Sequence, residues 1–270
     1  MRAKRSLGQH FLVSEGVVEK ILKVCREQCP SAAGVLEIGP GEGALTEGLA
    51  ALGRPFYALE VDYSLAIALQ DHFPGLTIIL ADATELDLPD FSKKAGLSPW
   101  LVAGNLPYNV GTPILENVLS SPGHVAAAIV MLQKEVAAKF CAGPGEEGYG
   151  LLAAGAAPWW EREILFTVKP GAFRPQPKVT SAVCIFKPKR HPDLPENERP
   201  CYLALLARAF AHPRKTLASN LSAAGLSHWQ TEACLASFGL PPDVRPGRTS
   251  VEALVKLLRI SEELGVRSEE

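Results

Sequence analysis

The feature that most constrains the fold of this chain is a regular alternation of short β-rich runs with helical stretches over the first 120 residues. The β-rich runs lie at 35–38, 56–59, 77–81 and 100–103, and the helical stretches lie near 44–52 and 64–73. This alternation predicts a parallel sheet whose strands are joined by crossover helices. The almost unbroken apolar run at 126–132 predicts one more central strand, covered on both faces. Before the first strand, Ser14 is placed to cap an amino-terminal helix.

The pattern changes in the second half of the chain. Two further β-rich runs, about 162–168 and 181–187, flank a proline-rich loop with no room for a helix, so we expect an antiparallel pair at the edge of the sheet. From 188 to 200 four prolines stand among charged residues, and only helical periodicity follows. We therefore expect an α/β, Rossmann-like domain over residues 1–187 and a small all-helical domain over residues 188–270.

Composition narrows the classes of protein. With 47% hydrophobic and 21% charged residues among 270, the chain can bury a full core. Its longest apolar run, 125–132, is shorter than the roughly 18 residues that a membrane span requires. The first residues do not read as a secretory signal, so we expect a cytoplasmic protein without a membrane partner. Only Cys25 and Cys29 of the six cysteines are close in sequence, so no metal site is expected.

Charge is distributed unevenly, although the net charge is only −2. Between residues 35 and 90 there are ten acidic residues and one basic residue, whereas between 162 and 220 there are eleven Lys and Arg and four acidic residues. The first region is suited to a ligand other than phosphate, and the second is suited to a polyanion. An uneven surface without a function is the alternative interpretation.

A glycine-rich turn, Gly39 to Gly43, follows the first predicted strand and lets a ligand approach the backbone, at Gly41 in particular. Glu60 ends the second strand, where its carboxylate can accept both hydroxyls of a ribose. Asp82 ends the third strand, where it can accept a hydrogen bond from an adenine amino group. Together they predict an adenosine-bearing cofactor. The turn fits the spacing G-x-G-x-G and the dinucleotide spacing G-x-G-x-x-G/A, so a nicotinamide-dependent oxidoreductase stays an alternative.

The fourth strand ends in Asn105, Leu106, Pro107 and Tyr108, where the reactive group of such a cofactor should lie. An adenine amino group is a poor nucleophile because its lone pair is delocalised into the ring. The Asn105 oxygen and a backbone carbonyl of Leu106 or Pro107 can accept its two hydrogens, which favours a pyramidal nitrogen. Proline stiffens the turn, and Tyr108 offers a face on which an extruded base can stack. The segment resembles that of methyltransferases that modify the exocyclic amino groups of bases.

Further segments extend this resemblance over nearly the whole chain. They are residues 4–12, 36–43, 133–137 and 170–181. The chain resembles the ribosomal RNA adenine dimethyltransferase family, and its bacterial small-subunit branch in particular. The resemblance implies a class I methyltransferase fold, S-adenosylmethionine as cofactor, and N6,N6-dimethylation of two adjacent adenosines near the 3′ end of small-subunit RNA.

The resemblance also assigns roles to single residues. The implied cofactor contacts are His10, Leu12, Gly39, Gly41, Glu60, Asp82 and Asn105. Phe173 is implied to lie opposite Tyr108, so that the target base is held between two rings; taken by itself, a Phe in a proline-rich loop is usually core packing. The family commonly has Asn where this chain has His10, so the side-chain contact changes while the backbone contact is kept.

The carboxyl-terminal region carries the implied RNA contacts. Arg208, His212, Arg214 and Lys215 resemble the basic segment of the family, and we expect Arg208, Arg214 and Lys215 to bind RNA phosphates. A solvated basic helix face is the alternative. The implied partner is small-subunit ribosomal RNA within an assembling 30S particle, and the chain is expected to act as a monomer.

Two other functions stay open. A large-subunit RNA adenine methyltransferase of the macrolide-resistance type would share the fold and the adenine pocket. Those enzymes typically have Asn-Ile-Pro-Tyr or Asn-Ile-Pro-Phe where this chain has Asn105 to Tyr108. A factor that binds assembling ribosomes, with incidental methylation, would need the same basic surface.

Overall fold

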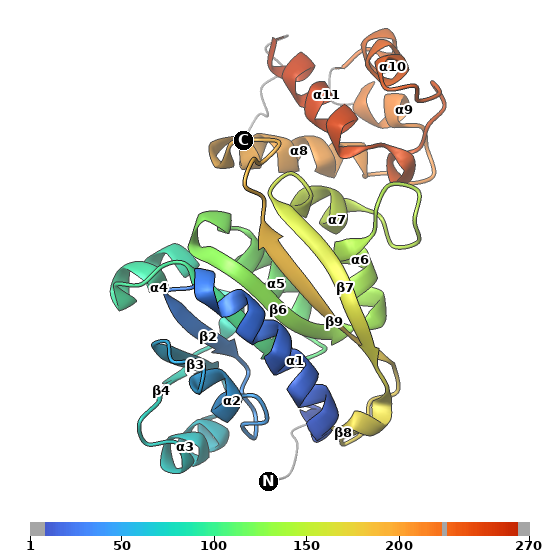
Figure 1. Ribbon diagram of the computed structural model, residues 1–270. Helices are drawn as coiled ribbons and strands as arrows, with labels where there is room; N and C mark the ends of the chain where they lie inside the picture. Colours follow the sequence, from blue (N-terminus) through green and yellow to red (C-terminus); the bar gives the residue numbers. More distant parts are fainter. Residues whose placement is uncertain (1–8, 223–225, 264–270) are drawn as a thin grey trace. The chain divides into compact units, whose positions relative to one another are not determined.

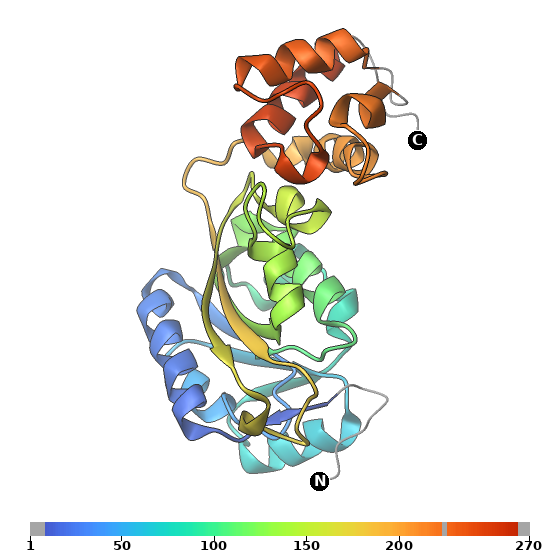
Figure 2. The same cartoon turned by 90° about the vertical axis from the view of Figure 1, so that its right-hand side faces the viewer.

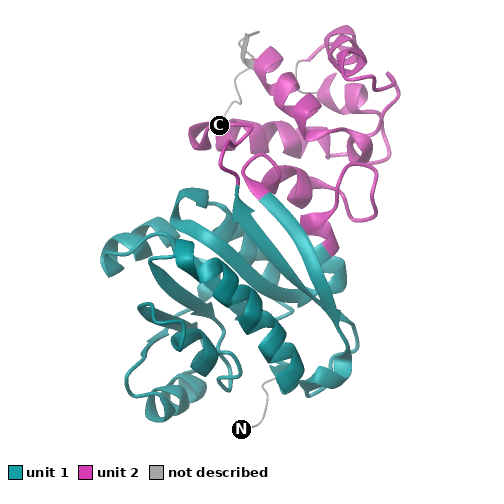
Figure 3. Ribbon diagram, viewed as in Figure 1, with its two compact units in different colours: residues 1–137, 161–188 teal, residues 138–160, 189–270 magenta. Residues whose placement is uncertain are grey.

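The structure is a computed structural model that describes residues 9–222 and 226–263. Residues 4–8, which carry part of the amino-terminal resemblance, lie outside the described residues. Contacts within the chain divide it into two compact units, residues 1–137 with 161–188 and residues 138–160 with 189–270 (Figure 3).

The first unit is built on a seven-stranded sheet. Its strands are β2 (Gly34–Ile38), β3 (Phe56–Glu60), β4 (Thr77–Leu80), β5 (Trp100–Asn105), β6 (Val125–Gln133), β7 (Trp160–Val168) and β9 (Ser181–Pro188). They lie in the order β4-β3-β2-β5-β6-β9-β7 (Figure 1). The strands from β4 to β6 in this order pair in parallel, and β9 runs antiparallel to β6. The predicted parallel sheet with an antiparallel edge is confirmed.

Helices cover both faces of this sheet. They are α1 (Glu15–Gln28), α2 (Thr46–Ala50), α3 (Tyr63–His72), α4 (Leu88–Ala95) and α5 (Gly111–Leu119). Side chains alternate along a strand, so Leu101 and Ala103 of β5 share one core with Cys25 of α1. Figure 2 shows α1 on one side of the sheet and α5 on the other. Ser14 is the N-cap of α1 as predicted, but its side chain makes no capping hydrogen bond.

A separate two-stranded sheet ties the amino-terminal segment to the loop between β7 and β9. β1 (Phe11–Leu12) pairs antiparallel with β8 (Phe173–Arg174). The N–H of Val13 extends the pairing by donating to the Ala172 oxygen at 2.8 Å. The two strands are too short to show an alternating pattern, so the sequence did not predict them. Their pairing holds the residues just before β1 beside the carboxyl ends of the parallel strands.

The second unit is helical. Its helices are α7 (Leu151–Ala156), α8 (Arg199–Ala209), α9 (Leu217–Ser222), α10 (His228–Ser237) and α11 (Val251–Glu263), and α6 (Lys134–Cys141) crosses from the first unit into the second in sequence. Tyr202 of α8 donates to the Ala154 oxygen at 3.2 Å and packs edge-on against Trp159. Residues 138–160 thus pack with the carboxyl-terminal helices. The domain boundary predicted after residue 187 stays a proposal. It differs from this division of the chain in leaving residues 138–160 in the first domain.

Three further observations concern the residues that the structure describes. No helix among them is both long enough and apolar enough to cross a bilayer. Across the ranges 9–222 and 226–263, no three His, Cys, Asp or Glu side chains gather as a metal site would require. None of the six cysteines forms a disulfide, and four of them are buried.

Candidate active site

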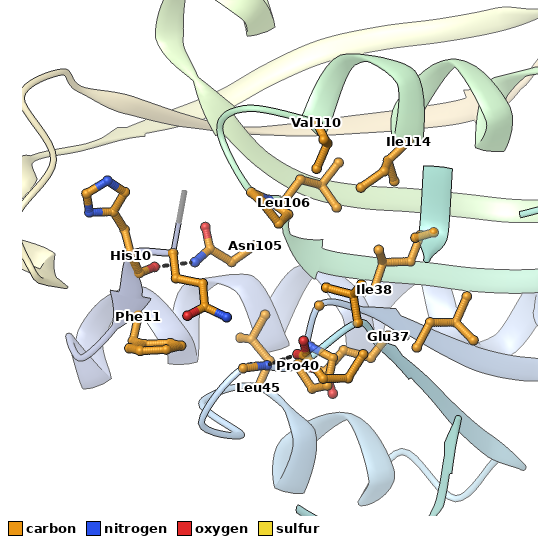
Figure 4. A pocket seen from close by; sticks show the side chains of 18 of the residues that line it. His10, Phe11, Glu37, Ile38, Pro40, Leu45, Asn105, Leu106, Val110 and Ile114 are labelled. Carbon is orange, nitrogen blue, oxygen red and sulfur yellow. Dashed lines mark hydrogen bonds between the residues drawn. The ribbon is translucent and has the colours of Figure 1, made fainter. Parts of the chain in front are cut away.

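A pocket opens at the carboxyl ends of β2, β3, β4 and β5, the edge at which open parallel sheets bind ligands. Its lining comes from the loops after these strands and from the segment around β1 (Figure 4). Among the lining residues are His10, Leu12, Gly39, Gly41, Glu60, Asp82, Asn105, Leu106, Pro107 and Tyr108. The structure therefore brings together all the sequence-predicted cofactor and base residues of this unit except Phe173.

The glycine turn after β2 forms one wall of the pocket. Gly39 and Gly41 have φ angles of +65° and +61°, which side chains with a Cβ rarely adopt. A Cβ at Gly41 would also lie 3.1 Å from the Phe11 ring. The Gly41 N–H instead donates to Glu60 Oε2 at 3.1 Å, which ties the turn to the end of β3.

Glu60 presents its carboxylate to this pocket although it is only 4% exposed. Oε2 accepts from Gly41, and Oε1 accepts from the Asp62 N–H at 2.9 Å. Burial raises the pKa of Glu60, and these backbone hydrogen bonds oppose the rise. Each carboxylate oxygen accepts more than one hydrogen bond, so both oxygens keep capacity for the two hydroxyls of a ribose.

Asp82 follows β4, the neighbour of β3, and lines the same pocket as Glu60. Its Oδ1 accepts from the Thr84 N–H and the Thr84 hydroxyl, each at 2.8 Å. Within the described chain Oδ2 accepts no hydrogen bond, so it is available to an adenine amino group. The bonds to Thr84 hold the side chain in place.

Glu37, near the end of β2, lines the pocket but was not among the site residues predicted from the sequence. Its side chain is 1% exposed, and Oε2 accepts a hydrogen bond of 2.7 Å from the Thr46 hydroxyl. Burial raises the pKa of Glu37 from 4.5 to about 8; the Thr46 bond opposes the rise, and the Glu60 carboxylate adds to it. The sequence does carry a sign of its importance: Glu37 is an acidic residue in an otherwise apolar strand, and carboxyl groups are rarely buried without a partner or a function.

The pocket lining is acidic. Its acidic residues are Glu37, Glu42, Glu60 and Asp82, and no Lys or Arg lines it within the described chain. With a pKa of about 8, Glu37 is mostly uncharged near pH 7. Such a lining favours a cation over an anion, although Glu42 and Asp82 are exposed and water screens their charge. A pyrophosphate would meet four carboxyl groups here and no basic partner.

Asn105 is the last residue of β5, and a hydrogen bond fixes the orientation of its side-chain amide. Its Nδ2 donates to the His10 carbonyl at 2.9 Å, and Figure 4 shows its oxygen on the other side of the amide. That oxygen, Oδ1, is buried and accepts no hydrogen bond from any described residue. Gly104 lets β5 approach β2 closely, since a Cβ there would lie 2.3 Å from the Ile38 oxygen. The sequence patterns did not indicate a role for Gly104, which precedes Asn105 and allows the close approach of the two strands.

The next two residues decide which backbone carbonyl can serve beside Asn105. The Pro107 oxygen already accepts from the Val110 N–H at 3.2 Å, in a turn that leads into α5. The Leu106 N–H donates to the Met131 oxygen at 3.1 Å, which anchors the start of the segment to β6. The Pro107 oxygen thus has one of its two lone pairs engaged, which favours the Leu106 oxygen as the predicted second acceptor.

Tyr108 is held at the mouth of the pocket by two contacts. Its hydroxyl and that of Ser181, a buried residue of β9, lie 2.5 Å apart. Its ring centroid lies 5.0 Å from that of His10, with the two planes inclined by 34°. Burial raises the pKa of Tyr108, so the phenol stays neutral at physiological pH.

Phe173 does not reach this pocket. Its ring is 1% exposed and belongs to the core of the first unit, next to Leu12, with which it pairs in the short sheet. A ring buried in this way has no face for a base. The stacking role expected for Phe173 stays a prediction, and it requires that the loop around β8 rearrange when RNA binds.

The predicted RNA contacts lie in the second unit. Arg208 is in the last turn of α8, and Arg214 and Lys215 are exposed in the loop before α9. Asn220 of α9 holds that loop, although it is only 4% exposed. Its Oδ1 accepts from the His212 N–H at 3.0 Å, and its Nδ2 donates to the His212 oxygen at 3.1 Å. The basic side chains therefore stand on a fixed backbone.

Nearly the whole chain is similar to proteins of known function. A sequence profile described as ribosomal RNA adenine dimethylase matches residues 1–259. The chain belongs to the ribosomal RNA adenine dimethylase family. A relative from Geobacter metallireducens, named ribosomal RNA small subunit methyltransferase A, is 36% identical over 270 residues, with 98% of both chains covered. The resemblance predicted from the sequence motifs is confirmed.

Solved structures agree in fold with this dimethylase. The 23S rRNA methyltransferase ErmE gives a TM-score of 0.75 at 24% identity, covering 92% of this chain and 98% of that one. A dimethyladenosine transferase from Plasmodium falciparum gives 0.73 at 20% identity, covering 95% and 98%. At these identities the likeness shows the fold alone, and it confirms the predicted class I methyltransferase architecture.

The pocket fits S-adenosylmethionine, the cofactor of this family. The ligand carries a sulfonium and an ammonium group, which suit a lining with four acidic residues and no Lys or Arg among those described. Glu60 and Asp82, for which the sequence predicts contacts with the ribose and the adenine amino group, both line the pocket. Gly39 and Gly41 leave room for the ligand against the backbone.

Proposed function

We propose that this dimethylase converts two adjacent adenosines near the 3′ end of small-subunit ribosomal RNA to N6,N6-dimethyladenosine. The observation that carries the proposal is Oδ1 of Asn105, a buried acceptor that receives no hydrogen bond within the described chain and lines an acidic pocket. A buried polar atom without a partner costs about 1–3 kcal/mol. The amino group of an extruded adenine would supply the missing donor.

The chemistry follows from two acceptors and one ring. Bound S-adenosylmethionine supplies an electrophilic methyl group. Asn105 Oδ1 accepts one hydrogen of the adenine amino group and the Leu106 oxygen accepts the other, so the nitrogen becomes pyramidal and its lone pair points out of the ring plane. Tyr108 stacks on the base, a contact worth about 1–3 kcal/mol. The alkylated nitrogen loses its proton readily to water, so no side chain has to act as a base.

The choice of small-subunit RNA rests on the relatives and on charge. The Geobacter relative acts on the small subunit by its name. Arg208, Arg214 and Lys215 offer positive charge for RNA phosphates, which the acidic pocket does not. We further propose that the enzyme is cytoplasmic and acts as a monomer on an assembling 30S particle.

Methyl incorporation tests the proposal. Small and large ribosomal subunits from cells that lack adenine dimethylation are incubated with the protein and with S-adenosylmethionine labelled in its methyl group. We expect label in N6,N6-dimethyladenosine of the small subunit and none in the large subunit. Label in large-subunit RNA alone would reject the proposal in favour of the macrolide-resistance type of enzyme.

Calorimetry tests the cofactor separately. We expect binding of S-adenosylmethionine and none of NAD, because the pyrophosphate of NAD would meet Glu42, Glu60 and Asp82 with no Lys or Arg among the described lining residues. Binding of NAD without S-adenosylmethionine would support an oxidoreductase. Particle binding without methyl incorporation would support an assembly factor.

A further inference from the structure

His10 connects three separate parts of the base site. Its backbone oxygen accepts the hydrogen bond from Asn105 Nδ2 at 2.9 Å. Its ring packs against that of Tyr108, with centroids 5.0 Å apart. Its Nδ1 lies 2.7 Å from the Pro175 oxygen. The backbone of this residue thus contacts one reactive residue of the site, and its side chain contacts another.

The contact with Pro175 fixes the ring of His10. A carbonyl oxygen only accepts, so Nδ1 carries the proton. In the pairing of β1 with β8, Phe11 lies opposite Arg174, and one further step along each strand places His10 opposite Pro175. Proline has no N–H to continue the ladder. The imidazole of His10 supplies a hydrogen bond at this step, and the bond leaves the ring little freedom to rotate.

The ring of Tyr108 is consequently held from two sides. The Ser181 hydroxyl, on a fully buried residue, holds the phenol oxygen. His10 holds the ring. Phe11, the other aromatic side chain among the described lining residues, lies over Gly41. Among the described residues, His10 is therefore the aromatic neighbour of Tyr108 in the pocket.

We propose that the His10 side chain is the positioning residue for Tyr108, holding it in the orientation on which the target adenine stacks. The inference rests on the proposed function and adds to it the residue that prepares the stacking surface. The two contacts of His10 are separable. Its backbone oxygen orients Asn105 whatever the side chain is, so a substitution at this position alters the stacking surface and leaves the amide of Asn105 in place.

Two substitutions separate the ring from the hydrogen bond. His10→Asn places an amide nitrogen where histidine has Nδ1, so it keeps a donor for Pro175 and loses the ring. His10→Phe keeps a ring beside Tyr108 and loses the donor. Steady-state kinetics with undermethylated small subunits should show KM for the particle raised about threefold to tenfold in His10→Asn, with kcat within about twofold of the wild type, because part of a stacking contact is lost. His10→Phe should raise KM less than His10→Asn does, because it keeps a ring beside Tyr108 but loses the bond to Pro175.

A spectroscopic signal reports the stacking itself. With 2-aminopurine in place of the target adenine in the small-subunit RNA, stacking quenches its fluorescence. We expect quenching on binding of the wild type and of His10→Phe, and weaker quenching with His10→Asn. Ser181→Ala, which removes the partner of the phenol, should weaken quenching as well, and the double variant His10→Asn with Ser181→Ala should weaken it most.

Each other outcome has a definite meaning. Wild-type KM and quenching in His10→Asn would overturn the inference and leave the proposed function intact. Equal losses in His10→Asn and His10→Phe would also overturn it, because the ring would then not be what matters. Absence of methyl transfer by the wild-type protein would instead refute the proposed function.

Discussion

The pocket of the first unit and the basic loop of the second unit are built in opposite ways. In the pocket, Glu37 and Glu60 are 1% and 4% exposed, and hydrogen bonds from the protein hold both carboxyl groups. In the basic loop, Arg214 and Lys215 are exposed, and only the backbone beneath them is held, by Asn220. The pocket has acidic side chains and no cation among its described lining residues, whereas the loop presents cations to water.

The difference teaches how the two tasks are divided. Methyl transfer to one nitrogen needs donors and acceptors at fixed positions in a desolvated site, where a single atom matters. Phosphate contacts need charge within reach of a polyanion, and salt screens them. Changes in the pocket should therefore alter the reaction, and changes in the loop should alter affinity and its dependence on salt.

The largest expected effect comes from Asn105→Ala. The substitution removes Oδ1, the acceptor for the adenine amino group, and we expect kcat to fall by about 100-fold or more, by analogy with the loss of one transition-state hydrogen bond elsewhere. Single-turnover methyl transfer measures it. Filter binding to small subunits should change less than about twofold, and a parallel loss of particle binding would contradict the separation of the two regions.

The next effect is on stability and comes from Glu37→Gln. The folded-state pKa of Glu37, about 8, lies above its ordinary value of 4.5, so the neutral carboxyl favours folding. That contribution is fully present below about pH 4.5 and is lost as pH rises through 8, with a slope of about 1.4 kcal/mol per pH unit between the two values. The glutamine variant has no such slope.

Denaturant unfolding at a series of pH values measures this slope. Relative to the wild type, Glu37→Gln should gain about 2 kcal/mol of stability between pH 6 and pH 8. Thr46→Val, which removes the hydroxyl that donates to Glu37, serves as a control and should keep the slope. Parallel pH curves for wild type and Glu37→Gln would show that the carboxyl is not buried in the neutral form.

The smallest effect is expected in the basic loop. Arg214→Ala and Lys215→Ala should each weaken RNA binding and reduce the slope of log affinity against log salt by about 0.7–0.9, one phosphate contact apiece. Titrations at several salt concentrations measure the slope. Lys256→Ala in α11, an exposed cation outside the loop, is the control and should leave the slope unchanged. Equal slopes in all variants would remove the loop from the RNA interface.

The sequence predicted those features that depend on neighbours along the chain. The strands, the glycine turn and the acidic residues at the strand ends follow from local patterns, and the ends of parallel strands necessarily meet at one edge. That is why the sequence alone predicts that Gly39, Glu60, Asp82 and Asn105 share one pocket.

The sequence could not predict what residues far apart impose on each other. Phe173 has the same neighbours in sequence whether it faces a base or the core, and only the pairing of β8 with β1 puts it in the core. Residues 138–160 follow a central strand, yet they pack with the carboxyl-terminal helices.

By itself the sequence determined the family, the parallel sheet and the chemical types gathered at its edge, since these follow from local composition and spacing. Only the tertiary structure decided what holds the Asn105 amide in its orientation. Its nitrogen donates to the oxygen of His10, 95 positions away, and its oxygen accepts no hydrogen bond from a described residue. Hydrogen-bond partners and burial are settled by contacts across the fold, because a buried polar atom must find its partner wherever the chain brings one.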